Sequence, residues 1–175
     1  MRNLIRSLLL PVLAVGLLAT AGCRDTGSEG ELFQIQSKLF VFNYRVATAT
    51  YLVNLTPLQP VAEGQTAIAS FENPAGGERI VVRQKIWPKL EKTTLESPPL
   101  NCVVKDRPYA VSIAIEGSDG AVLQKIETTM TSSEDQTILP DAPLVVGPVY
   151  TPNPDLVGHP DGKLPEGTGV KCPSA

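Results

Sequence analysis

Four side chains in this sequence could carry reactive chemistry: three cysteines, Cys23, Cys102 and Cys172, and a single histidine, His159. A thiol beside an imidazole can act as a nucleophile with its general base, so Cys172 and His159 are the first candidates for a catalytic pair. No cluster of His, Cys, Asp and Glu has the spacing of metal ligands. His159 is therefore interpreted as a solvated loop residue, and the sequence predicts no metal site.

Other catalytic signatures are missing as well. The stretch Gly117-Ser118-Asp119-Gly120 is not a Gly-x-Ser-x-Gly nucleophile elbow, which also requires a strand-to-helix turn. The sequence has no Ser-x-x-Lys motif and no glycine-rich phosphate loop. Glu127, Glu134 and Asp135 could bind a cation together, although a solvated charged loop is the simpler interpretation. We therefore expect no catalytic residue, no cofactor and no enzyme activity.

The first residues have the pattern of an export signal. Arg2 and Arg6 form a basic start, and the segment 8–18 is apolar apart from Pro11 and Gly16. A helix of that length rises about 16 Å, which is too short for a hydrocarbon core of about 30 Å. The pattern is typical of a signal peptide rather than a permanent membrane span.

Two cleavage sites fit the end of this segment. Ala19-Thr20-Ala21 matches the small-x-small site of ordinary signal peptidase, which would cut before Gly22. Thr20-Ala21-Gly22-Cys23 resembles the lipobox of bacterial lipoproteins, with Thr20 in place of the usual Leu. The resemblance implies a diacylglyceryl thioether and an N-acyl group on Cys23, and several acyl chains together anchor a protein stably. In such lipoproteins an Asp after the Cys favours the inner membrane, so Arg24 indicates the outer membrane, facing the periplasm.

Lipidation of Cys23 would leave two thiols in an oxidising compartment. Exported proteins pair such thiols, so we expect a disulfide between Cys102 and Cys172. The closed loop would contain about 70 residues, for which the chain-entropy treatment gives about 4 kcal/mol of stabilisation. This bond explains Cys172 better than a nucleophilic role does.

Composition limits the number of domains and the class of partner. Removal of residues 1–22 leaves thirteen basic and eighteen acidic residues, a formal net charge of −5. Since the sequence has no basic cluster, nucleic acid is a poor partner. About 150 residues remain, enough for one domain with its own core. The predicted organisation is a signal peptide at 1–22, a lipidated tether at 23–31, a domain at 32–139 and a tail at 140–175.

The pattern of the domain predicts short strands separated by turns. Tyr109, Val111, Ile113 and Ile115 alternate with other residues and should face the core, together with one face of the segment 122–130. With no crossover helix, the expected fold is an all-β, antiparallel, Ig-like or transthyretin-like β-sandwich. Residues 132–136 should form a loop or a single helical turn. Extended segments are predicted at 39–53, 65–71, 78–87, 100–104, 109–116 and 121–130.

Residues 140–175 contain eight Pro and five Gly, which predicts a Pro/Gly-rich extended tail. A short strand is expected at 144–146, but the stretches 151–154 and 159–162 should not sustain a β-ladder. Cys172 would staple the tail back over the domain near residues 100–104. Two roles stay open for the tail: a pre-extended docking surface for a partner, or a cover for a sheet edge.

These features favour a membrane-anchored, non-catalytic envelope lipoprotein that binds or braces another envelope protein close to its membrane. At the level of architecture it is similar to the small outer-membrane lipoproteins of type VI secretion systems, which carry a β-sandwich behind a lipidated Cys. The alternative is a ligand-binding protein, for example for glycan, with exposed Trp87, Tyr51 and Tyr150 as contact aromatics. Trp87 also suits a core or rim position at a strand end.

Overall fold

The computed structural model describes residues 30–164 and 172–173, so Cys23 and both cleavage sites lie outside the described residues. In the described part the chain is almost entirely strand and turn, and no helix there is long and apolar enough to cross a membrane. The strands are β1 (Phe33–Asn43), β2 (Thr48–Pro57), β3 (Thr66–Phe71), β4 (Ile80–Lys85), β5 (Thr93–Glu96), β6 (Pro108–Glu116), β7 (Val122–Thr131), β8 (Val145–Val146) and β9 (Thr151–Pro152). Two short 3-10 turns are η1 (Gln136–Ile138) and η2 (Pro154–Leu156).

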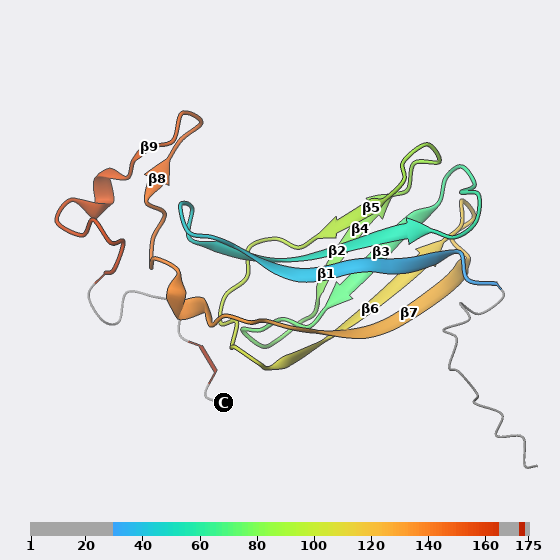
Figure 1. Cartoon of the computed structure of the whole chain (residues 1–175), viewed down its shortest axis with the longest axis horizontal. Coiled ribbons are helices and arrows are strands. Elements are labelled where there is room, and N and C mark those ends of the chain that lie inside the picture. The colour runs from blue at the N-terminus through green and yellow to red at the C-terminus, as the bar shows by residue number, and fades with distance from the viewer. Residues whose placement is uncertain (1–29, 165–171, 174–175) are drawn as a thin grey trace, which may run out of the picture.

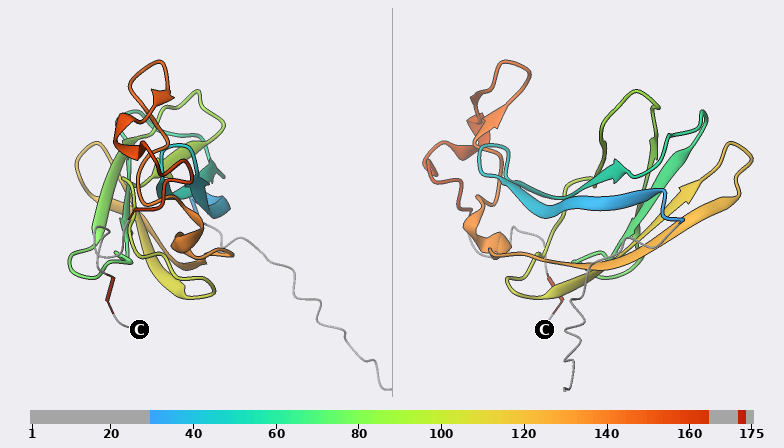
Figure 2. Two further views of the ribbon diagram at one scale, coloured as in Figure 1. Left: turned by 90° about the vertical axis from the view of Figure 1, so that its left-hand side faces the viewer. Right: turned by 45° about the vertical axis from the view of Figure 1, so that its right-hand side comes forward.

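Two antiparallel sheets make up the body of the molecule (Figure 1). One has the order β1–β2–β5 and the other the order β4–β3–β6–β7. Figure 2 shows the sheets as two layers, with the chain after β7 projecting from one end. The predicted all-β antiparallel sandwich is confirmed.

The single extended segment expected at 39–53 is wrong, because this region is a hairpin. The chain turns back at residues 44–47, and Asn43 pairs with Thr48. The turn contains neither Gly nor Pro; Ala47 instead takes a positive φ of 53°. β-Favouring residue types continue on both sides of the turn, so their pattern did not reveal it.

The segment 100–104 is not a strand either. It touches β2 through one bridge, between Leu100 and Ala49, and Cys102 has a φ of 66°, which is incompatible with a strand. The edge of this sheet is instead β5, in which Thr93 and Leu95 are buried. Four residues are too few for a clear alternation, which is why the sequence did not predict β5.

The core lies between the two sheets. The inner face of β6 is fully buried, as predicted, and consists of Tyr109, Val111, Ile113 and Ile115. On β7, Met130 is buried and Ile126 is partly buried against the core. Val122 was expected on the same face but is 50% exposed, because its pairing with Glu116 at the start of β7 is irregular.

Aromatic rings connect the two sheets. Tyr51 of β2 stacks on Phe71 of β3, with ring centroids 4.8 Å apart and planes 6° from parallel. Phe40 of β1 packs against Tyr51 at 4.6 Å and against Tyr109 at 5.7 Å. Such ring pairs add stabilisation beyond the area they bury, so this cluster is a main contact between the layers.

Tyr109 also positions the loop that leads into β6. Its hydroxyl accepts a 2.8 Å hydrogen bond from the backbone N–H of Val104. A Tyr near the start of the sixth strand that bonds back to the backbone upstream is the tyrosine corner of immunoglobulin-like domains. The corner favours the Ig-like form of the sandwich over the transthyretin-like form.

Side chains close the open side between β1 and β7. The Gln124 side chain on β7 accepts hydrogen bonds from the N–H groups of Leu32 and Phe33 and donates to the carbonyl of Phe33, at 2.8 to 3.0 Å. Lys38 of β1 donates to the carbonyl of Thr129 on β7, 2.7 Å away. Since β1 and β7 belong to different sheets, these bonds join the two layers.

Residues 140–164 fold into a compact C-terminal extension beyond the β1–β2 turn, not into a tail laid over the sandwich (Figure 1). The N–H of Leu144 donates to the carbonyl of Arg45 in that turn, at 2.9 Å. Residues 151–152 pair with β8, contrary to the expectation that they could not join a ladder. The Asn153 side chain caps η2 and donates to a carbonyl of the extension at 2.8 Å, an anchor that proline and glycine content does not reveal.

Candidate functional site

The sandwich has two ends with different loops. We call the end where β1 starts the proximal end; its loops are 58–65, 86–92 and 117–121. The distal end carries the turn 44–47, the loops 72–79 and 97–107, and η1. The C-terminal extension continues from the distal end (Figure 1).

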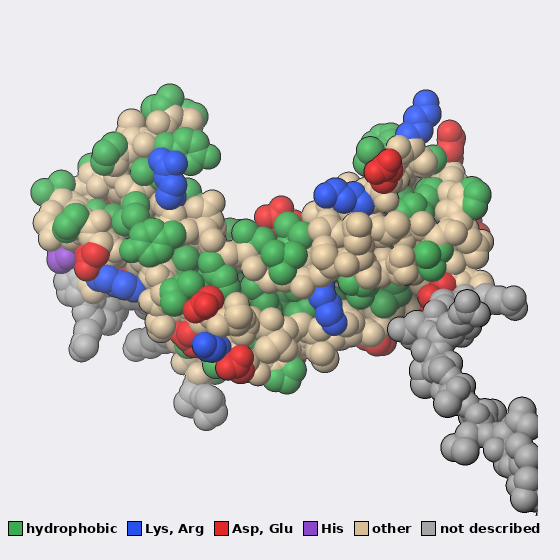
Figure 3. Space-filling view, viewed as in Figure 1, with side chains coloured by type: hydrophobic (Ala, Val, Ile, Leu, Met, Phe, Trp, Pro, Cys, Tyr) green, Lys and Arg blue, Asp and Glu red, His purple; other side chains and the backbone are tan. Residues whose placement is uncertain are grey.

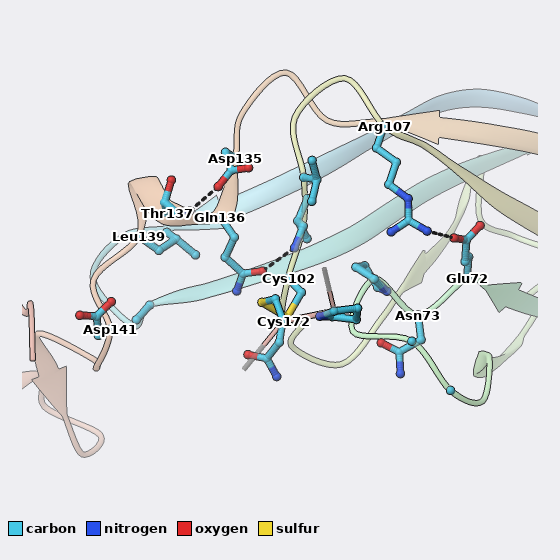
Figure 4. A pocket seen from close by; sticks show the side chains of 18 of the residues that line it. Glu72, Asn73, Cys102, Arg107, Asp135, Gln136, Thr137, Leu139, Asp141 and Cys172 are labelled. Carbon is cyan, nitrogen blue, oxygen red and sulfur yellow. Dashed lines mark hydrogen bonds and ion pairs between the residues drawn. A yellow bond between two sulfur atoms is a disulfide. The ribbon is translucent and has the colours of Figure 1, made fainter. Parts of the chain in front are cut away.

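A groove of about 1010 Å³ is hollowed into the distal end. Its walls come from five parts of the chain: Ala47 in the β1–β2 turn, the loop after β3, the loop before β6, η1 with the residues around it, and Cys172 with Pro173. Figure 4 shows the charged and amide side chains around it. Those that matter for its chemistry are Glu72, Arg107, Asp135, Gln136 and Asp141.

The Cys102–Cys172 disulfide lines this groove and confirms the predicted pairing. The two Cα atoms are 5.4 Å apart although the residues are 70 positions apart in sequence. The bond holds the last described residues against the loop that precedes β6. It also occupies the Cys172 sulfur, so Cys172 and His159 do not form a nucleophile and base.

The turn η1 is fastened to the loop 97–107 by Gln136 (Figure 4). Its side chain accepts a hydrogen bond from the N–H of Val103 and donates to the carbonyl of Leu100, both at 2.9 Å. Asp135 caps η1, because its carboxylate accepts the N–H of Thr137 at 3.0 Å. That bond lowers the pKa of Asp135, so the cap is strongest above the ordinary aspartate pKa and weakens as the pH falls below it.

Glu72 and Arg107 form an ion pair in the wall of the groove (Figure 4). The guanidinium donates to the Glu72 carboxylate at 2.7 Å and stacks over the Tyr109 ring, 4.7 Å from its centroid. The backbone carbonyl of Glu72 accepts a 3.0 Å hydrogen bond from the Tyr51 hydroxyl. Burial raises the pKa of Tyr51 above its ordinary value, and the nearby Tyr109 and Glu72 add to the shift, so this hydroxyl remains a neutral donor.

The acids of the groove already hold structural bonds. Glu72 pairs with Arg107, Asp135 caps η1, and Asp141 accepts the N–H of Leu164 at 2.9 Å. Within residues 30–164 and 172–173, no three His, Cys, Asp or Glu side chains are grouped to hold a metal. The groove therefore presents acids that are already engaged in ion pairs and caps.

The three acids considered as an alternative cation site, Glu127, Glu134 and Asp135, are not grouped to hold a metal. Glu127 projects from the outer face of β7 and accepts a 2.8 Å hydrogen bond from the hydroxyl of Ser112. Asp135 caps η1 instead, and the backbone carbonyl of Glu134 accepts a bond from Ser132. The carboxylates of Glu127 and Asp135 thus make local structural bonds.

The three aromatic residues proposed as ligand contacts do not form one site. Tyr51 is fully buried in the core, so its expected exposure is wrong; it shares the alternation of Val53 on β2 and stacks between the sheets. Trp87 is 51% exposed at the proximal end, with the Lys85 ammonium 4.2 Å from its ring centroid. Tyr150 is 57% exposed on the extension, next to Arg45.

Backbone strain is concentrated around the groove and the extension. Four non-glycine residues in the described chain have positive φ: Ala47, Cys102, Asp106 and Tyr150. Each such conformation is unfavourable for an L-residue by about 1–2 kcal/mol. Ala47 and Cys102 line the groove directly. Strained backbone of this kind is held by the surrounding structure and often accompanies binding sites. The residue types at these positions did not predict the strain.

Comparison with known proteins assigns no family. The sequence matches no known protein family, and no curated protein is similar to it. Among solved structures, the chain is similar to an endonuclease/exonuclease/phosphatase from Beutenbergia cavernae DSM 12333, at 15% identity and a TM-score of 0.29. The match covers 54% of this chain and 27% of that one. A likeness at this TM-score carries no argument about fold or activity.

Proposed function

We propose that the protein is an exported, lipid-anchored envelope module that binds another envelope protein through its distal end and its C-terminal extension. The observation that carries the proposal is the position of these parts. The predicted anchor, Cys23, precedes β1 at the proximal end, whereas the extension packs on the β1–β2 turn at the opposite end. The eleven residues of β1 separate the two by about 36 Å.

The exposed side chains of the extension support a protein partner. Val149, Tyr150 and Val157 are 77%, 57% and 85% exposed. Large apolar side chains in such positions are typical of protein contact sites when they gather together. Figure 3 shows hydrophobic side chains clustered over the extension, at the upper left. The adjoining groove adds charged and amide groups that could set specificity.

A contact role also fits the chemistry of the described residues better than turnover does. The acids of the groove are engaged in caps and ion pairs, and the disulfide occupies Cys172. A glycan site is less well supported, because Trp87 and Tyr150 lie at opposite ends and Tyr51 is in the core. A hydrolytic activity abolished by changing His159, Glu127 or Asp135 would overturn the contact role.

The anchor is tested by Cys23→Ser. We expect the variant to leave the membrane fraction and to lack the added lipid mass seen for the wild type. The Cys172→Ser variant is the matched control, since it removes a cysteine without touching the predicted lipidation site. A Cys23→Ser protein that still sediments with membranes at the wild-type mass would disprove the anchor.

The binding surface is tested by a photo-crosslinking amino acid placed at Val149 in intact cells. Val81, which is 59% exposed on β4, is the matched control position. We expect a discrete protein adduct from position 149 and none from position 81. The Val157→Asp change on the same extension should abolish the adduct. Equal adducts from both positions, or none from either, would contradict the proposed surface.

A further inference from the structure

Three loops meet at the proximal end. The N–H of Ile86 donates to the carbonyl of Gln65 at 2.9 Å, which joins the loop 86–92 to the loop 58–65. Gly64 lies so close to Ser118 that a Cβ on it would come within 2.7 Å of the Ser118 Cβ. A small cavity of about 430 Å³ separates Glu63 and Gly64 from residues 85–88. The three loops therefore lie side by side at this end.

The surface at this end is unusually apolar for loop tips. Five large hydrophobic side chains are between 44% and 53% exposed there, and we call them the proximal face: Leu58, Trp87, Leu90, Val122 and Leu123. Segments 58–65, 85–92 and 117–123 together hold three lysines and three acids, so their formal charges cancel. Figure 3 shows both kinds of charge beside hydrophobic side chains at this end, on the right. The surface suits an apolar contact rather than one driven by net charge.

The predicted anchor enters the domain beside this face. Gly30, the first described residue, is seven positions after Cys23. Even fully extended, seven residues reach no more than about 25 Å. The carbonyl of Leu32 accepts the N–H of Leu58 at 2.8 Å, so the start of β1 is attached to one of the loops. A lipid on Cys23 would hold the proximal face within this distance of a bilayer.

We infer that the proximal face docks on the membrane that carries the anchor, with the Trp87 ring at the boundary between headgroups and acyl chains. The inference rests on the proposed lipid anchor. Trp is the side chain that most favours this boundary, since its ring is apolar and its N–H is polar. Lys85, whose ammonium lies 4.2 Å from the ring centroid, can extend its charge toward the headgroups while its stem stays on apolar surface.

Anchoring makes such a contact effective even though the face is small. A few half-exposed side chains would bind a bilayer weakly from free solution, but a tether converts the contact into an intramolecular one. The result is an orientation: the sandwich stands on its proximal end, and the C-terminal extension points away from the membrane. The length of β1 then sets the height of the extension above the bilayer.

The chain contains one tryptophan, so tryptophan fluorescence reports on Trp87 alone. The lipidated full-length protein is inserted into phosphatidylcholine vesicles that carry a doxyl quencher near the headgroups, and bound protein is collected by flotation. We expect the doxyl lipid to quench Trp87 severalfold more strongly than it quenches the double variant Trp87→Phe/Tyr150→Trp. Aqueous acrylamide should show the reverse order, because position 150 remains in water.

Three further outcomes would overturn the inference. Protein that floats with the vesicles while both tryptophan positions respond equally to doxyl lipid and to acrylamide would overturn the docking and leave the anchor intact. Protein that does not float would overturn the anchor and the docking with it. The Leu90→Asp/Leu123→Asp variant should float but lose the doxyl quenching, whereas Leu39→Asp, on β1, should keep it. A Leu90→Asp/Leu123→Asp protein that keeps the doxyl quenching would also overturn the docking.

Discussion

A glutamine side chain bonds to backbone groups at each end of this sandwich, but the loops at the two ends differ in backbone conformation. At the proximal end the Gln124 amide bonds to the backbone at the start of β1, and at the distal end the Gln136 amide bonds to the loop before β6. Two of the three proximal loops turn at glycines, Gly64 and Gly120, whose positive φ involves little strain. The distal end also has such glycines, Gly76 and Gly77, but adds the non-glycine residues Ala47, Cys102 and Asp106 in the same left-handed conformation, and a disulfide.

This difference fits the two different roles proposed for the ends. Relaxed glycine turns form without help from the rest of the fold, whereas strained residues persist only where surrounding contacts hold them. The distal end is thus held by long-range contacts, above all the disulfide and the Gln136 side chain. Such a preorganised surface suits the selective recognition proposed for the distal end, whereas the proposed membrane docking of the proximal loops requires only exposed apolar side chains.

The largest expected effect comes from removing the disulfide. Cys172→Ser should lower the free energy of unfolding by up to about 4 kcal/mol, since the unfolded chain regains the freedom of a closed loop of about 70 residues. Hydrogen exchange should accelerate at the distal end first, while the amides of Leu32 and Phe33 change less. Equal acceleration at both ends would mean that the disulfide does not stabilise the distal end selectively.

A change in the shared core should not distinguish the ends. Ile113 is fully buried on β6, and Ile113→Ala should cost about 2–4 kcal/mol through the cavity it leaves. Denaturant unfolding measures the loss, and exchange should rise at both ends together. A loss below about 0.5 kcal/mol would show that the site collapses around the smaller side chain.

The two glutamines provide a matched pair of smaller changes. Gln124→Ala and Gln136→Ala each remove an amide that satisfies backbone groups, so each should cost about 1–3 kcal/mol. Gln124→Ala should raise exchange at Leu32 and Phe33, and Gln136→Ala should raise it at Val103. If either variant loosened the opposite end as strongly as its own, the two ends would behave as one unit.

The smallest expected effect is a gain in stability. Ala47→Gly relieves a left-handed conformation, partly offset by the greater freedom of glycine in the unfolded chain, so a gain of up to about 1 kcal/mol is expected. The same change at Ala69, which is buried on β3 and has no positive φ, should destabilise the protein. Destabilisation by Ala47→Gly would show that the Ala47 methyl group contributes more than the strain removes.

Several features of this protein are determined by local sequence alone. The strict alternation from Tyr109 to Ile115 assigned the buried face of β6, because successive side chains of a strand point to opposite sides. The disulfide was predicted from the cysteine count, because two cysteines outside the lipobox-like motif allow only one pairing. A loop or a single helical turn was expected at 132–136, and a single turn, η1, follows directly, with Asp135 as its cap.

Other features were decided only by the tertiary structure. The split of residues 39–53 into β1 and β2 depends on pairing along the whole hairpin, which holds Ala47 in a conformation its residue type does not favour. Tyr51 is equally suited by type to a surface or a core, and its place was settled by stacking on Phe71 from the other sheet. Which loops share an end, and hence the separation of the proximal face from the extension, follows from strand order. Strand order is a property of long-range pairing, and a local pattern of residue types contains no information about it.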